Sequence, residues 1–141
     1  MKLNTFANGF QKVNKAYDKV CEPLVDEIGI PKTAFDILMF FGNHPEYNTA
    51  KDIVKVRGLK ANLVSINVDR LVNEGYLERI YDTKDRRKIF LSITKKSNGI
   101  IEKGKILQQN FFNSILQNIS EEDLETTKRV FMKMEQNIEK M

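Results

Sequence analysis

The sequence predicts a mainly α-helical fold that contains one β-hairpin, and three observations point to it. Apolar residues recur at helical spacing through most of the 141-residue chain. Two short runs rich in β-branched and aromatic residues, 76–81 and 88–93, flank the polar, turn-forming stretch DTKDRR. Glycine or proline stands where most of the helical patterns stop. The length fits one domain, or one domain with a helical appendage.

The first helix is predicted over residues 3–28, where apolar residues alternate steps of three and four, as in a heptad seam. Gly29 ends this helix, and Pro31 suits the first turn of a second helix that the His44-Pro45 pair closes. In the second helix, Phe35, Leu38 and Phe41 are expected to point inward. The seam of the first helix consists of Leu3, Phe6, Phe10, Val13, Tyr17, Val20 and Leu24.

Two short helices follow, near 49–56 and at about 60–74, and Arg57-Gly58 breaks the chain between them. Asn48 or Thr49 can cap the first of the two. At 100° per residue, the second helix directs Val64, Val68 and Leu71 inward and directs outward Asn62, Ser65, Ile66, Asp69 and Arg70. Two short amphipathic helices separated by a glycine-containing turn are the helix-turn-helix pattern, and the hairpin that follows would be its wing.

The terminal segments are predicted to be helical as well. Thr94 can cap a fifth helix, and Ser120 followed by three acidic residues is a strong start for a sixth. The apolar stripes of the terminal helices either pack on the middle domain or pair with a second copy of the chain, and we favour the pairing. The expected organisation is an N-terminal dimerisation helix at 1–30, a winged helix-turn-helix domain at 31–94 and C-terminal dimerisation helices at 95–141.

The positive charge of the chain is concentrated in its middle third. Residues 49–95 carry eleven Lys/Arg and six Asp/Glu, a net charge of +5, whereas the other residues carry 12 and 13, a net charge of −1. The whole chain has a formal net charge of +4. This asymmetry predicts an anionic partner for the middle segment.

The composition argues against several classes of protein. With one cysteine, Cys21, and one histidine, His44, neither an internal disulfide nor a Cys/His zinc site can form within one subunit, so we expect no metal and no cofactor. A Ser/His/Asp set is implausible with a single histidine, and the chain has no phosphate-cradling glycine motif, so we expect no enzyme. No apolar stretch is long enough to span a membrane, and no signal peptide is recognisable, so we expect a cytoplasmic protein without a membrane partner.

The segment RLVNEGYLERIYDTKDRRKIFLSIT resembles the winged-helix signature of the MarR (multiple antibiotic resistance regulator) family. The matching positions are Leu71, Gly75, Arg79, Asp85, Arg87, Ile93 and Thr94. The upstream helices and the long terminal helices also fit, so the resemblance spans nearly the whole chain. It implies a homodimeric transcriptional regulator, a repressor, that binds a pseudo-palindromic double-stranded DNA operator. The helix at about 60–74 would enter the major groove and the basic wing at 82–88 the minor groove.

By that analogy, Arg87 is the wing residue that enters the minor groove, where A·T-rich stretches concentrate negative potential. Alternatively, Arg87 forms an ion pair with Asp85 that stiffens the wing, and both roles can coexist. The neighbouring wing residues expected to contact phosphates are Lys84, Arg86 and Lys88. The candidates on the helix are Lys60, Asn62, Ser65, Ile66 and Arg70, of which Asn62 and Ser65 would read base edges and Arg70 would contact phosphate.

Two positions depart from the family. Ile66 stands where many members have arginine: it could pack on a thymine methyl group, or DNA binding could be weak or lost. In the latter case the same fold would serve as a protein-interaction adaptor with Ile66 in its binding face. Ser97 stands where the family often has glycine. Cys21 does not align with the oxidant-sensing cysteine of some relatives, and we interpret it as a small buried hydrophobic residue.

The family typically carries a small-molecule cleft between its dimerisation helices and its winged domain. The candidate lining residues here would suit a small aromatic or apolar effector, although ordinary core packing explains each of them too. They are Phe10, Tyr17, Phe35, Met39 and Phe111.

Overall fold

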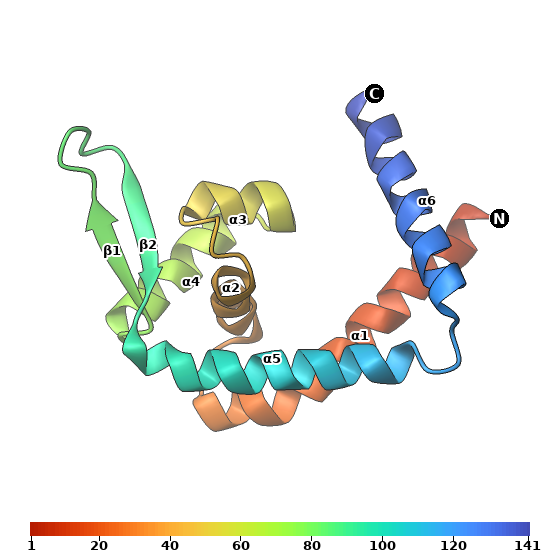
Figure 1. Cartoon of the computed structure of the whole chain (residues 1–141). Helices are drawn as coiled ribbons and strands as arrows, with labels where there is room; N and C mark the ends of the chain where they lie inside the picture. The colour runs from red at the N-terminus through yellow and green to blue at the C-terminus, as the bar shows by residue number, and fades with distance from the viewer. The chain divides into compact units, whose positions relative to one another are not determined.

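The computed structural model describes residues 1–141 and confirms the predicted fold class (Figure 1). Its helices are α1 (Leu3–Ile28), α2 (Lys32–Asn43), α3 (Ala50–Arg57), α4 (Ala61–Asn73), α5 (Lys95–Ile115) and α6 (Glu121–Glu139). Its strands, β1 (Leu77–Tyr81) and β2 (Ile89–Ile93), form one antiparallel two-stranded sheet. The predicted bounds of these elements hold to within about two residues.

The chain divides into two compact units, Met1–Gln109 and Asn110–Met141. The first contains α1 to α4, the hairpin and most of α5. The second contains the end of α5 and all of α6, which begins at Ser120, whose hydroxyl accepts a hydrogen bond from the backbone N–H of Asp123 at 3.1 Å. None of the helices has the length and apolar character that crossing a membrane requires.

The core of the first unit is built around α2, which buries seven of its twelve residues. Phe35, Leu38 and Phe41 are among them, as the sequence predicts. The other elements contribute residues that are at most 8% exposed to the same core: Cys21 and Leu24 from α1, Ile53 from α3, Val64, Val68 and Leu71 from α4, and Leu77 and Leu91 from the hairpin. The helix-turn-helix and the wing therefore share one apolar core, which sets their relative position.

Only the C-terminal end of α1 takes part in that core. Cys21 and Leu24 are buried, whereas Phe10, Val13 and Val20, from the same predicted seam, are each 43% exposed. The seam therefore lies on a helix as predicted, but within one chain most of its residues stay accessible to solvent.

The start of α5 packs on α2 at two glycines. A Cβ atom at Gly42 would lie 2.6 Å from Ile101, and one at Gly104 would lie 2.4 Å from the sulfur of Met39. Both distances are shorter than van der Waals contact, so the close approach of the two helices depends on the absence of side chains at these positions.

Of two helix caps that the sequence predicts, the structure has one, at Thr49, and places the Thr94 hydroxyl elsewhere. Thr49 caps α3 in a reciprocal capping box, because its hydroxyl accepts from the N–H of Asp52 at 3.1 Å and the Asp52 carboxylate accepts from the N–H of Thr49 at 3.0 Å. Those hydrogen bonds outweigh the slight burial of Asp52 and lower the pKa of its carboxyl group. Thr94, expected to cap α5, instead donates its hydroxyl hydrogen bond to the carbonyl of Gly75, because the turn before β1 lies against it.

Candidate nucleic-acid interface

The outward face of α4 carries the predicted helix candidates. The side chains of Asn62, Ser65 and Ile66 are exposed, as are those of Lys60, which precedes the helix, and Arg70 in its last turn. Their orientation follows from burial of the opposite face, where Val64, Val68 and Leu71 are at most 4% exposed. The core therefore holds α4 in place and leaves a row of mainly polar side chains facing solvent.

The turn between α3 and α4 is set by one glycine. Gly58 ends α3 in the left-handed region, at φ +67°, and its N–H donates to the carbonyl of Val54 at 3.0 Å. A side chain at this φ would be strained, so glycine is the residue that lets the chain turn here between two short helices.

Two aspartates order the tip of the wing. Asp82 accepts from the N–H of Lys84 at 2.9 Å, and Asp85 accepts from the N–H of Arg87 at 3.0 Å. The N–H of Lys88 donates to the carbonyl of Asp85 at 3.0 Å, which closes the turn. The basic side chains thus project from a hydrogen-bonded loop rather than from an open one.

Arg87 both contacts Asp85 and reaches into solvent. Its Nε lies 3.3 Å from Asp85 Oδ1, while its side chain is 92% exposed. Such an exposed pair contributes little to stability, but it limits the directions that the guanidinium group can take. The ion pair and an outward-reaching arginine are compatible in this geometry.

An ion pair between Arg79 and Asp69 joins the first strand of the wing to α4. Asp69 occupies the outward side of α4, and Arg79 lies in the middle of β1, where it faces Leu91 of β2 in the register. The sequence places Arg79 in a family signature but gives it no partner. The one feature of the sequence that could have identified this partner is Asp69 itself, an acidic residue on the outer face of the helix ten positions before Arg79.

Arg70 has partners within the protein. Its Nε lies 3.4 Å from Glu74 Oε1 one turn on, and its Nη2 lies 3.5 Å from the carbonyl oxygen of Gly29. Both contacts are long, and the side chain remains 46% exposed. The predicted phosphate contact would therefore compete with two weak intramolecular contacts.

The turn that leads from α4 into β1 is anchored by side chains from the region where α5 begins. The buried hydroxyl of Ser97 donates to the carbonyl of Tyr76 at 2.5 Å, and the ammonium group of Lys96 donates to that of Glu74 at 2.6 Å. Gly75, at φ +81°, makes the turn possible. Ser97 is thus a structural hydrogen-bond donor.

Residues 28–88, which hold α2, α3, α4, β1 and the wing tip, match the family model described as the MarR family. This segment therefore resembles the winged-helix domain of that family. The predicted resemblance is confirmed over this segment.

Known proteins similar to this chain agree with that resemblance. It is 24% identical over 116 residues to the uncharacterised HTH-type transcriptional regulator YwhA of Bacillus subtilis (strain 168), a match that covers 79% of this chain and 83% of YwhA. The crystal structure of the transcriptional regulator PA3341 has a TM-score of 0.84 at 18% identity and covers 96% of this chain and 99% of its own. The crystal structure of MepR from S. aureus in a DNA-binding conformation has a TM-score of 0.81 at 17% identity, covering 94% and 98%. At such identities the two crystal structures establish the fold.

The winged-helix domain contains a cavity of about 320 Å³ between α3, α4 and the hairpin. Most of its lining is apolar, with the polar atoms of Ser65, Lys51 and Arg79 at its edge. A second groove, of about 480 Å³, runs from the N-terminal end of α3 to the wing and is lined in part by Lys51, Arg87 and Lys88. Three basic side chains therefore lie around one groove beside the wing.

The predicted effector-cleft residues do not line either of these cavities. Phe35 and Met39 are at most 2% exposed and pack against Gly104 of α5. Phe10 is 43% exposed on α1, and Phe111 lies in the second unit. A cleft made of these residues stays a prediction.

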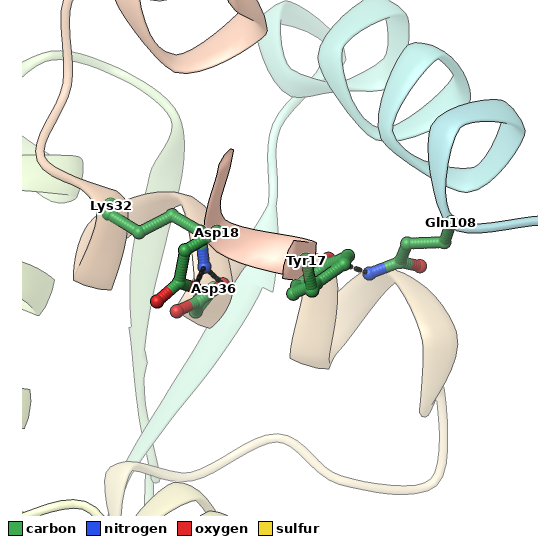
Figure 2. Close-up of polar contacts among 5 residues, drawn as sticks. All are labelled: Tyr17, Asp18, Lys32, Asp36 and Gln108. Atoms are coloured by element: carbon green, nitrogen blue, oxygen red, sulfur yellow. Dashed lines mark hydrogen bonds and ion pairs between the residues drawn. The ribbon is translucent and has the colours of Figure 1, made fainter. Parts of the chain in front are cut away.

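Tyr17, the remaining cleft candidate, belongs to a polar junction that links α1, α2 and α5 (Figure 2). Gln108 donates to the hydroxyl of Tyr17 at 2.8 Å and accepts from the side-chain amide of Asn43 at 2.9 Å. One glutamine of α5 thus joins the middle of α1 to the end of α2. Burial raises the pKa of the Tyr17 phenol well above its usual value, so the hydroxyl stays neutral.

Lys32 is the cation of the same junction (Figure 2). Its ammonium group lies 3.0 Å from Asp18 of α1 and 2.7 Å from Asp36 of α2, and 4.9 Å from the centre of the Tyr17 ring. Burial by itself lowers the pKa of Lys32, but Asp36 and Asp18 outweigh it and raise the pKa. Burial also raises the pKa of Asp36, although Lys32 opposes that shift.

Cys21 is fully buried one turn after Tyr17 on α1, and burial raises the pKa of its thiol. A neutral, inaccessible thiol is a poor nucleophile, which fits its interpretation as a small hydrophobic residue.

Proposed function

We propose that this protein is a homodimeric MarR-family transcriptional regulator that binds a pseudo-palindromic DNA operator. In this proposal α4 enters the major groove, and the wing at 82–88 reaches the adjacent minor groove. The observation that carries it is the combination, on one rigid domain, of an outward row on α4 and a hydrogen-bonded basic wing. The partner is inferred to be duplex DNA because the excess positive charge of the chain belongs to this segment.

The relatives support this proposal at the level of the family. YwhA is described as an HTH-type transcriptional regulator, and the MepR structure is described as being in a DNA-binding conformation. A protein of this family is not expected to be an enzyme. We assign 31–94 to DNA binding, and 1–30 and 95–141 to dimerisation, since α1 exposes apolar seam residues and α5 and α6 expose others, among them Phe112, Phe131 and Ile138.

Repression and control by an effector are the finer parts of the proposal. A dimer bound across promoter DNA would exclude polymerase. A small aromatic or apolar effector would relieve repression if it bound more tightly to a dimer whose α4 helices no longer match the half-sites. Candidate contact residues for it remain Phe10, Tyr17, Phe35, Met39 and Phe111.

One observation favours a second function. Ile66 is 64% exposed, and an exposed apolar residue on α4 would also suit a protein-binding face. An adaptor of this kind would bind its partner with little dependence on salt, whereas binding to DNA weakens steeply as salt rises because counterions are released.

The decisive experiment is genome-wide footprinting of the full chain, followed by salt titration of affinity on a recovered site. We expect the variant Arg87→Ala to bind more weakly and to lower the salt slope by about one. The matched control is Arg129→Ala, which removes the same charge from an exposed position on α6. The absence of any footprint, together with identical nonspecific binding by both variants, contradicts the proposal.

A further inference from the structure

Ile66 is the most exposed large apolar side chain of α4, ahead of Leu63, which is 42% exposed. It is 64% exposed, whereas Val64, Val68 and Leu71 of the same helix are at most 4% exposed. At 100° per residue, Ile66 points about 160° away from Val64, so it lies on the side opposite the core. The fold therefore does not use this side chain for packing within the domain.

Most neighbours of Ile66 along the helix are polar, the exception being Leu63 three residues before it. Asn62 lies one turn before it and Arg70 one turn after it, and both are exposed. An isoleucine at the centre of such a row is complementary to a surface that is mainly polar and anionic but carries one isolated apolar group. The major groove of DNA offers that pattern, since the 5-methyl group of thymine is the apolar group on its base edges.

From this placement we infer that Ile66 is a specificity-determining residue that packs on a thymine methyl group in each operator half-site. The inference rests on the proposed function, because it requires α4 to lie in the major groove. It goes further by naming the base and the group that is read. Asn62, one turn away, has the amide that pairs with adenine, so the two residues together would select an A·T-containing step.

The charge of the domain favours DNA over a protein as the partner of Ile66. The segment 49–95 has a net charge of +5, and Lys60 and Arg70 lie at the two ends of the same helix. A protein-binding face centred on Ile66 would have to leave these charges at its rim or pair them. On DNA they lie beside phosphates, where each contributes to affinity.

The test replaces thymine with 2′-deoxyuridine, which removes only the methyl group. Duplexes would first be selected from random DNA by the full chain, and each thymine of a selected site would then be replaced in turn. We expect one position in each half-site at which deoxyuridine lowers affinity about fourfold, the effect of one buried methyl-sized group. In the variant Ile66→Ala this loss should disappear.

Two further variants make the experiment specific. Ile106→Ala is the matched control, because Ile106 of α5 is also 64% exposed, and it should keep the fourfold discrimination whatever its absolute affinity. Ile66→Arg should transfer the preference at that position from thymine to guanine, since arginine reads the guanine edge. Both substitutions at Ile66 are on an exposed site, so circular dichroism should report unchanged folding.

The outcomes separate the inference from the proposed function. Specific binding that is insensitive to deoxyuridine at every position overturns the inference and leaves DNA binding intact. A loss on methyl removal that Ile66→Ala retains also overturns it. A failure to select any duplex, or salt-insensitive capture of a protein partner that Ile66→Ala abolishes, overturns both.

Discussion

Asp69 of α4 and Arg79 of β1 form an ion pair that ties the wing to the helix beside it. The two side chains are 58% and 29% exposed, so solvent weakens the pair and its contribution to stability is at most about 1 kcal/mol. Its larger effect is geometric. It adds a polar contact between the first strand of the hairpin and α4, the two elements proposed to contact DNA, to the apolar core that sets their relative position.

Breaking that pair should weaken DNA binding more than it weakens the fold. For Asp69→Ala we expect a loss of up to about 1 kcal/mol in the free energy of unfolding, measured by urea denaturation, together with a larger loss in operator affinity. The control is Glu27→Ala, which breaks the more exposed pair with Lys103, away from the wing. Equal losses in both variants would show that the pair acts only on stability.

Replacing Asp85 at the tip of the wing should lower the affinity of the protein for DNA. Asp85→Ala raises the net charge, and electrostatics alone predicts tighter binding. Because Asp85 accepts hydrogen bonds from Arg87, we expect instead that the loop becomes disordered and binding becomes weaker. Glu78→Ala, an exposed site on β1, makes the same charge change and should strengthen binding slightly. Fluorescence anisotropy at two salt concentrations distinguishes the two expectations.

The buried hydroxyl of Ser97 should contribute measurably to stability. In Ser97→Ala the Tyr76 carbonyl loses its closest donor but keeps the N–H of Thr94 at 3.3 Å, and we expect the free energy of unfolding to fall by about 0.5–1.5 kcal/mol. In Ser97→Gly the free energy of unfolding should fall further, because glycine also weakens a helix. Ser114→Ala removes a comparable hydroxyl from an exposed turn of the same helix and should change little. Urea denaturation of the three variants tests this order.

In the polar junction of α1, α2 and α5, replacing Lys32 should make the stability of the protein depend on pH. In Lys32→Met, Asp36 keeps its burial but loses its cation, so its pKa should rise further above the usual 3.8. A carboxyl group whose folded-state pKa is raised binds its proton more readily in the folded protein, so its contribution to stability falls as pH rises through that range. We therefore expect the variant to be destabilised at pH 7 and to recover as pH falls towards 4.

The control for this prediction is a second substitution. Lys32→Met combined with Asp36→Asn removes the buried carboxylate, so the pH dependence attributed to the junction should disappear from thermal unfolding curves. A single variant that loses stability equally at all pH values would mean that packing of the Lys32 stem, and not the charge of Asp36, is responsible.

The exposed apolar seam of α1 predicts a dimer interface, which a single substitution by aspartate should disrupt. Val13→Asp and Val20→Asp should each shift the protein from dimer to monomer in analytical ultracentrifugation, because an aspartate buried without a partner is costly. Val56→Asp is the matched control, since Val56 of α3 is 46% exposed, compared with 43% for both seam valines. A dimer that survives both seam substitutions would place the interface elsewhere.

The helices and strands of this protein, and the buried faces of its helices, follow from residues that are close together in the sequence. The capping box of Thr49 and Asp52, the inward set on α4 and the glycine turn at Gly58 depend on residues only a few positions apart. Their physics is local: capping, helical periodicity and backbone freedom act within one or two turns. For the same reason the exposed position of Ile66 was predictable before any fold was known.

The contacts between side chains of different elements depend instead on tertiary packing. Gln108 forms hydrogen bonds with Asn43 and Tyr17, which lie 65 and 91 positions away in the sequence. Ser97 donates to the carbonyl of Tyr76, which lies 21 positions away in the sequence. Tertiary packing also redirected the hydroxyl of Thr94 from a helix cap to a turn. No sequence period encodes such partners, because they are set by how α5 packs against α2 and the hairpin once the shared apolar core has formed.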